Sequence, residues 1–200
     1  MLPGSSIGQR LMLTSFGESH GKSIGAVLDG CPAGLEIDEK EIQKMLDLRK
    51  PGQSVISTQR KEGDIVEIIS GVFRGYTTGA PITMIVWNSD QKSTDYENLK
   101  TKLRPGHSDY PAMIKYNHFN DYRGGGRFSG RLTATHVMGG AIARKLLKVA
   151  LNVETNSFTT QIGKIKMENK FDEKMISSIY KNEVRCPEKN TAKKMKSAIL

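Results

Sequence analysis

The side chains best suited to chemistry are gathered in residues 104–131, RPGHSDYPAMIKYNHFNDYRGGGRFSGR. A glycine run is bracketed there by Arg123 and Arg127, and His107 follows a Pro-Gly turn signal beside Arg104. Glycine lets backbone N–H groups approach an anion closely, and an arginine fork binds phosphate or carboxylate at two points. A flexible surface loop with solvated arginines is the alternative interpretation. The clustering of these groups favours an anion-binding site.

A second polar turn lies near the N-terminus, where residues 17–21 read GESHG. It presents an acid, a hydroxyl and an imidazole between glycines, and His20 suits proton donation or anion binding. A turn histidine that makes one local hydrogen bond is the alternative. The spacing differs from the GxSxG of a hydrolase nucleophile turn, so this segment does not predict a hydrolase.

Composition limits the classes of partner. The net charge of +9 favours anionic partners such as nucleic acid, a membrane surface or a phosphorylated metabolite. Aromatic residues make up only 6% and do not alternate with the basic ones, which argues against a nucleic-acid-binding module. No apolar run matches a membrane span and no signal-peptide core is evident, so we predict a cytoplasmic protein with no membrane partner.

Cysteine and histidine spacing indicates no metal. Cys31 and Cys186 each precede a proline, lack metal-ligand spacing and are predicted to be free thiols in a reducing cytosol. No pair of His, Cys or acidic residues shows ligand spacing supported by a third, so the predicted site contains no metal. We assign His118 and His136 no role.

The elements that must position these groups are short strands and amphipathic helices. Apolar and β-branched runs predict strands at 11–16, 24–28, 65–69 and 82–87. Helices are predicted at 38–48, from 131 onward, at 172–181 and at 190–200, with a strand pair within 152–165.

Three local signals refine these predictions. Asp38 with Glu41 three residues later is a helix-start signature. Asp29-Gly30 is typical of a hairpin turn. The glycine run comes just before the helix predicted from residue 131, so the N-terminus of that helix should favour an anion.

A series of motifs runs in order along the chain: GESHG at 17–21, DGCP at 29–32, RKPGQS at 49–54, SGVF at 70–73, TTGAPI at 77–82, RPGHSDY at 104–110 and DYRGGGR at 121–127. Together they resemble those of the chorismate synthase family, which catalyses the last step of the shikimate pathway. The motifs are long, stand in family order and cover nearly the whole chain, so the resemblance is highly specific.

The resemblance implies a lyase of aromatic amino acid biosynthesis. Its reaction converts 5-enolpyruvylshikimate 3-phosphate to chorismate, with loss of phosphate in a 1,4-elimination and removal of a ring proton. The family needs reduced FMN as a cofactor, although the net reaction is redox-neutral, because flavin passes electron density to the substrate transiently. Some members also reduce the flavin with a nicotinamide cofactor, NADPH.

Carried over motif by motif, the resemblance assigns roles to individual residues. The substrate-binding positions are Ser19, His20, Arg49, Arg104 and Arg131. His20 would protonate or hold the departing phosphate, and His107 would protonate or polarise the reduced flavin near N1 and O2. Arginine suits the planar carboxylates and the phosphate of this substrate better than lysine does.

The cofactor positions show departures from the family. Arg127, Phe128 and Ser129 match the flavin-contacting triplet. The commonest family pattern there is RSSARETA, whereas this chain has RFSGRLTA, so Phe128 lacks a hydroxyl and Leu132 lacks an acid. Arg49 and Val55 stand at the family's NADP positions, and Val55 replaces an arginine found in many members.

The resemblance also implies an architecture. The fold class is α+β, a β-α-β sandwich core in a homotetramer. Family members are nearly twice as long, and their C-terminal half supplies the rest of the flavin pocket and an aspartate thought to help remove the ring proton. We therefore expect residues 1–200 to be the N-terminal part of a single domain that is incomplete at its C-terminus. An inactive fragment of the enzyme is the alternative, and a basic nucleic-acid-binding module is the less favoured one.

Overall fold

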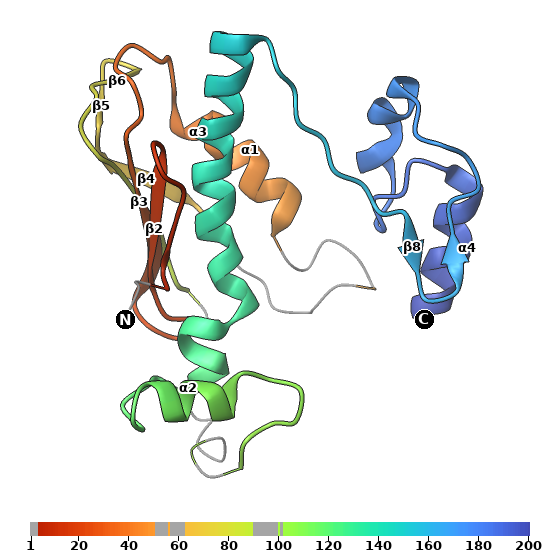
Figure 1. Cartoon of the computed structure of the whole chain (residues 1–200), viewed down its shortest axis with the longest axis horizontal. Coiled ribbons are helices and arrows are strands. Elements are labelled where there is room, and N and C mark those ends of the chain that lie inside the picture. The colour runs from red at the N-terminus through yellow and green to blue at the C-terminus, as the bar shows by residue number, and fades with distance from the viewer. Residues whose placement is uncertain (1–3, 51–55, 57–62, 90–99, 101) are drawn as a thin grey trace. The chain divides into compact units, whose positions relative to one another are not determined.

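The computed structural model describes residues 4–50, 56, 63–89, 100 and 102–200 (Figure 1). The chain divides into two compact units, Met1–Lys50 with Lys61–Asn152 and Pro51–Arg60 with Val153–Leu200. We call them the N-terminal unit and the C-terminal unit. That both belong to one domain of a longer protein stays a prediction.

A five-stranded antiparallel sheet is the framework of the N-terminal unit. In spatial order its strands are β1 (Ser6–Ile7), β2 (Met12–Gly17), β3 (Ser23–Asp29), β7 (Ile82–Trp87) and β4 (Val66–Ser70). Leu13 lies opposite Leu28 and Ile24 opposite Val86, so buried apolar side chains line up across the strands. The predicted strands are confirmed, and β1 is an addition that the sequence analysis missed.

Two helices, α1 (Glu39–Arg49) and α3 (Thr133–Leu151), pack on one face of this sheet (Figure 1). Their fully buried side chains are Ile42 and Leu46 from α1 and Met138 and Ile142 from α3. A Cβ on Gly139 would lie 2.5 Å from Leu13 Cδ1, so α3 approaches β2 closely. The core therefore lies between the sheet and this helix pair.

The start of α1 follows its sequence signature. The Asp38 side chain accepts a hydrogen bond from the Glu41 backbone N–H at 2.9 Å, as expected for a helix cap. The helix ends at Arg49, one residue before Lys50, whose N–H donates to the Leu46 carbonyl. Arg49 is thereby held at the end of a packed helix.

The hairpin predicted at Asp29-Gly30 is wrong. The sheet neighbours of β3 are β2 and β7, and the chain leaves β3 toward α1. Gly30 is nonetheless required, because its φ is +80° and a Cβ would lie 1.8 Å from the Arg10 carbonyl oxygen. The dipeptide marks a strand end here.

Shorter elements complete the N-terminal unit. A two-stranded ribbon joins β5 (Val72–Phe73) and β6 (Tyr76–Thr77). The helix α2 (Asp109–Lys115) follows residues 104–108. The glycine run lies in the segment η2 (Arg123–Phe128), where Gly124, Gly125 and Gly126 have positive φ and are not helical. A 3-10 turn, η3 (Gly130–Leu132), leads into α3.

The C-terminal unit is small. It contains the hairpin β8 (Gln161–Ile162) and β9 (Ile165–Lys166), the 3-10 helix η4 (Glu173–Lys181) and the helix α4 (Lys189–Ile199). Its core is formed by Val184, Cys186, Ala192 and Met195. The predicted strand pair is confirmed only at residues 161–166, and the helix predicted at 172–181 has 3-10 geometry. Both cysteines are free, as predicted, and both are buried.

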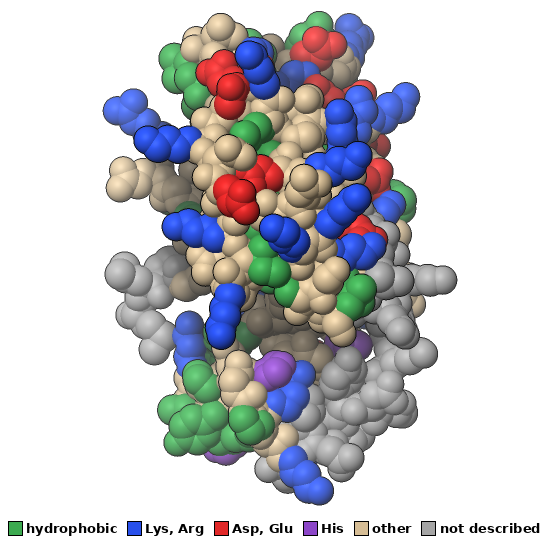
Figure 2. All heavy atoms as spheres, turned by 90° about the vertical axis from the view of Figure 1, so that its right-hand side faces the viewer, with side chains coloured by type: hydrophobic (Ala, Val, Ile, Leu, Met, Phe, Trp, Pro, Cys, Tyr) green, Lys and Arg blue, Asp and Glu red, His purple; other side chains and the backbone are tan. Residues whose placement is uncertain are grey.

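Charge is dispersed on the face in Figure 2, where acidic side chains lie between the lysines and arginines. Across the described ranges, no helix is long and apolar enough to cross a bilayer. No group of three His, Cys, Asp or Glu side chains with metal-binding geometry occurs among the same residues.

Glu188 should make the stability of the C-terminal unit pH-dependent. Hydrogen bonds from Thr191 and from Asn169 lower its pKa from the ordinary 4.5 to about 2. A depressed folded-state pKa contributes stability that is present above the unfolded pKa and lost as pH falls through the folded value. We predict that Glu188→Gln flattens the fall in urea-unfolding midpoint between about pH 4.5 and pH 2, followed by circular dichroism.

The control is Glu173→Gln, a change at an exposed acid on η4. It should keep the pH dependence of the unaltered chain. Equal slopes for Glu188→Gln and the unaltered chain would show that Glu188 does not carry the effect.

Candidate active site

Loops far apart in sequence meet at one end of the sheet, and Asn88 joins them. Asn88 directly follows β7, and its Nδ2 donates to the carbonyls of Glu18 at 3.2 Å and Gly21 at 2.8 Å. On the other side of the same loop, the Ser19 N–H donates to the Gly126 carbonyl at 3.2 Å. The polar turn between β2 and β3 is thereby fixed against the glycine run.

Ser19 and His20 are buried within this junction, with exposed fractions of 0% and 4%. A Cβ on Gly124 would lie 2.4 Å from His20 Cδ2 and 3.4 Å from Ser19 Oγ, so the backbone of the glycine run rests against the imidazole. Gly124 has a φ of +56°, which L side chains rarely adopt. The structure therefore brings together the two polar turns that the sequence analysis singled out.

Asp121 supplies negative charge near His20. Burial raises the pKa of its carboxyl, but hydrogen bonds from Arg123 and the neighbouring charges of Arg123 and His20 together lower it. The bond distances from Arg123 are 2.8 Å from Nε to Oδ1 and 2.7 Å from Nη2 to Oδ2. This carboxylate stays charged beside the imidazole.

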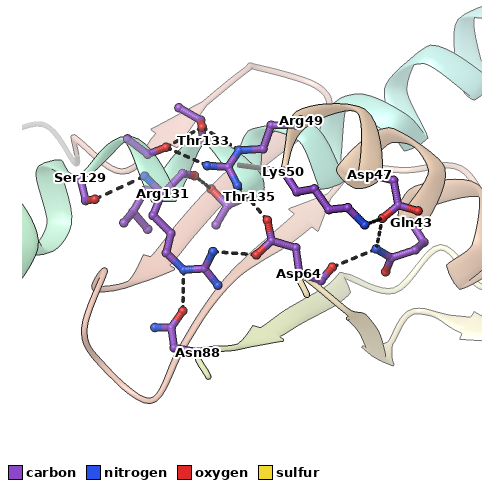
Figure 3. A network of polar contacts seen from close by, with 12 residues as sticks. Gln43, Asp47, Arg49, Lys50, Asp64, Asn88, Ser129, Arg131, Thr133 and Thr135 are labelled. Atoms are coloured by element: carbon purple, nitrogen blue, oxygen red, sulfur yellow. Dashed lines mark hydrogen bonds and ion pairs between the residues drawn. The ribbon is translucent and has the colours of Figure 1, made fainter. Parts of the chain in front are cut away.

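Asp64 lies between two of the predicted substrate arginines (Figure 3). Its Oδ1 accepts from Arg131 Nη1 at 2.6 Å and its Oδ2 from Arg49 Nη1 at 2.8 Å. The Nε of Arg131 also donates to Asn88 Oδ1 at 2.7 Å. Arg131 is 5% exposed and ion-paired, an environment that the sequence analysis did not predict.

Arg49 connects the end of α1 to the start of α3. Its Nε donates to Thr133 Oγ1 at 3.3 Å and its Nη2 to the Gly130 carbonyl at 3.4 Å. Its side chain is 21% exposed, so this guanidinium borders solvent while that of Arg131 is covered. Ser129 caps η3 by accepting a hydrogen bond from the Arg131 N–H.

The glycine run itself differs from the prediction. Arg123 pairs with Asp121, and Arg127 Nη2 donates to the Ser15 carbonyl at 2.8 Å and to Ser15 Oγ. Both bracketing guanidinium groups therefore brace the loop. The run does not open α3 directly, because η3 lies between them, so the predicted helix N-terminus at the glycines is wrong.

Arg104 and His107 lie on the turn before α2, and Arg104 is beside the glycine run. The Arg104 guanidinium donates two hydrogen bonds to the Asp109 carboxylate, with lengths of 2.8 and 2.9 Å. These hydrogen bonds lower the pKa of Asp109. A Cβ on Gly125 would lie 3.6 Å from Arg104 Nη2. His107 is exposed, and its Nδ1 is 3.2 Å from the Pro105 carbonyl oxygen.

Phe128 borders a cavity of about 380 Å³ that is also lined by Ser15, Lys115, Tyr116, Arg127 and His136. The Phe128 and Tyr116 rings are 6.1 Å apart, and Lys115 Nζ lies 5.4 and 6.0 Å from the Tyr116 and Phe128 ring centres. Aromatic faces with a nearby cation and hydroxyls suit a planar ring that carries anionic groups.

Another cavity, of about 390 Å³, lies between α2 and the glycine run and is lined by Asp109, His118, Asp121 and Gly125 among others.

Of the predicted residues, Val55 lies outside the described part of the chain. Sequence reasoning missed Asp64 and Asn88. The only local signals for them were a Gly-Asp before one strand and an asparagine directly after another.

The fold and site define an α+β protein with an antiparallel sheet, a packed helix pair and a junction of ion-paired arginines at one end of the sheet. A sequence model of the chorismate synthase family matches residues 11–200. Relatives named chorismate synthase include one from Christiangramia forsetii, 50% identical over 99% of this chain and 55% of its own length. Another, from Methanococcus aeolicus, is 48% identical over 98% of this chain and 55% of its own.

A solved structure described as a crystal structure of chorismate synthase superimposes with a TM-score of 0.71 and 29% identity, covering 95% of this chain and 53% of that one. The chain belongs to the chorismate synthase family. It spans about half the length of the curated relatives it matches. The family and the α+β fold class predicted from the motifs are confirmed.

Gly124 offers a test of the close approach to His20. We predict that Gly124→Ala lowers the free energy of unfolding by about 1–3 kcal/mol, because it adds a Cβ at positive φ against the imidazole. The NMR signals of the His20 ring should shift at the same time.

Gly130→Ala is the matched control, since a Cβ there meets no atom within 4 Å. It should change stability by less than about 0.5 kcal/mol. An unshifted His20 ring in Gly124→Ala would contradict the packing described for this loop.

Proposed function

We propose that the natural protein containing this chain converts 5-enolpyruvylshikimate 3-phosphate to chorismate, as a lyase of aromatic amino acid biosynthesis. The observation that carries the proposal is the convergence of Ser19 and His20 with the Arg49–Asp64–Arg131 network at one end of the sheet. Membership of the family over residues 11–200 supports it.

The charges of the junction suit this substrate. The substrate carries a phosphate and two carboxylates, and the guanidinium groups of Arg49 and Arg131 suit such anions because an arginine fork binds them at two points. Arg104, which is paired with Asp109, lies beside Gly125. We assign Ser19, His20, Arg49, Arg104 and Arg131 to substrate binding. Burial of the junction strengthens each of these interactions relative to water.

The elimination breaks the C–O bond to phosphate at one end of the reacting system and a ring C–H bond at the other. His20, buried next to Ser19, would donate a proton to the departing phosphate or hold it by a hydrogen bond. Asp121 supplies a carboxylate near it, whose pKa is lowered despite burial by hydrogen bonds from Arg123. The group that removes the ring proton is not assigned to this chain.

The family implies reduced FMN, and the residues present fit it. Phe128, Tyr116 and Lys115 offer aromatic faces and a cation around a cavity of about 380 Å³, next to Arg127 and Ser129. The chemistry supplied by a bound reduced flavin is transient electron donation to the substrate. His107, on its exposed turn, would protonate or polarise the flavin near N1 and O2.

Further assignments follow from family membership. NADP at Arg49 and Val55, a homotetramer and a cytoplasmic location are proposed on that basis. The isolated 200-residue chain should form little or no chorismate, because it spans 55% of its relatives' length. A chorismate assay on the isolated chain with reduced FMN tests this, and turnover comparable to that of the natural protein would contradict it.

His20 is the residue whose loss should affect turnover most. We predict that His20→Asn in the natural protein lowers kcat about 100-fold or more, because a general acid contributes roughly 10²–10⁴-fold. Phosphate release with reduced FMN under anaerobic conditions is the measurement.

The matched control is His118→Asn, since His118 has a φ of +65° that asparagine tolerates. That variant should turn over at close to the unaltered rate. Unaltered kcat in His20→Asn, with bound flavin and an intact fold, would remove His20 from the reaction.

A further inference from the structure

The Asp64 carboxylate divides its oxygens between the two arginines. The Asp64 side chain is fully buried, with an exposed fraction of 0%, and each oxygen accepts from a different guanidinium. We propose that Asp64 is a positioning residue that fixes the separation and orientation of Arg49 and Arg131 for the anionic groups of the substrate. This inference rests on the proposed function and deepens it.

The backbone holds Asp64 in the orientation that this role requires. Its φ is +47°, in the left-handed region, directly after Gly63. The Asp64 carbonyl accepts a hydrogen bond from Gln43 Nε2 at 3.1 Å, and Gln43 Oε1 accepts from the Val66 N–H at 3.1 Å. Gln43 of α1 thus holds the backbone at Asp64 and at Val66, where β4 begins. This anchoring directs the Asp64 carboxylate toward Arg49 and Arg131.

Charge explains why one carboxylate is needed. Two guanidinium groups close together repel each other, and Arg131 is only 4% exposed, so water cannot screen it. A single shared carboxylate compensates one of the two charges. Asp64 therefore holds together two side chains that would otherwise repel each other.

The arginines are also held from their other sides. Asn88 accepts from Arg131 Nε and donates to the Gly21 carbonyl, so Arg131 and the loop carrying His20 share one anchor. Arg49 is held by Thr133 and Gly130 at the start of α3. Asp64 bonds to both guanidinium groups and thereby fixes their positions relative to each other.

A purely structural ion pair would give a different kinetic result. Loss of stability alone lowers the active fraction, and therefore kcat per total protein, without altering KM. Misplaced arginines weaken substrate binding, and KM rises in the correctly folded fraction. A rise in KM therefore indicates a positioning role, whereas a fall in kcat at unaltered KM indicates a purely structural one.

The test uses the natural protein with reduced FMN and compares Asp64→Asn, Asp64→Glu and Asp47→Asn. Asp64→Asn keeps the shape and removes the charge, and we expect KM for 5-enolpyruvylshikimate 3-phosphate to rise about tenfold or more. Asp64→Glu restores the charge on a longer arm and should recover part of that loss. Asp47→Asn, at an acid of α1 that pairs with Lys50 and not with Arg131, should keep KM within about twofold.

The outcomes are distinct. Unaltered KM in folded, flavin-binding Asp64→Asn overturns the positioning role while the proposed function stands. If Asp64→Asn does not fold, Asp64→Glu decides, because the displaced arginines should still raise KM, and unaltered KM there overturns the inference. If the unaltered protein makes no chorismate, the proposed function fails and this inference fails with it.

Discussion

The ion pairs of Asp64 are the constraint on which the rest of the site depends. A buried guanidinium without a compensating charge typically costs about 3–5 kcal/mol when its partner is removed. Asp64, 2.6 Å from Arg131, compensates this buried guanidinium, and the same carboxylate holds Arg49. Through these contacts the end of α1, the start of α3 and the turn before β4 meet at one place (Figure 3).

The sheet makes this meeting possible. β2, β3 and β7 are neighbours, so the loop that follows β2 and the residue that follows β7 emerge together, and Asn88 bonds to both Arg131 and the Gly21 carbonyl. The glycine run closes the junction from the other side, since only residues without a Cβ let the chain rest on His20. Rigid elements thus position a buried hydroxyl, an imidazole and two guanidinium groups.

Patterns among residues close in sequence predicted the features that short-range interactions determine. Strand alternation, the Asp38 cap and the helical spacing of α1 were confirmed, because each depends on residues close in sequence. The environment of Arg131 was not predicted, because its partner Asp64 is 67 residues away in sequence. Asp64 and Asn88 were missed for the same reason. The motifs identified the family but carried no information on which acid neutralises which arginine.

The most direct measurement is a crystal structure of the natural protein with 5-enolpyruvylshikimate 3-phosphate and FMN. We expect the substrate's phosphate to lie against Ser19 and His20. Arg49 and Arg131 should contact its anionic groups, with Asp64 still bonded to both arginines. A substrate bound elsewhere in the protein, with these side chains arranged as described here but not contacting it, would contradict the assignment of the active site.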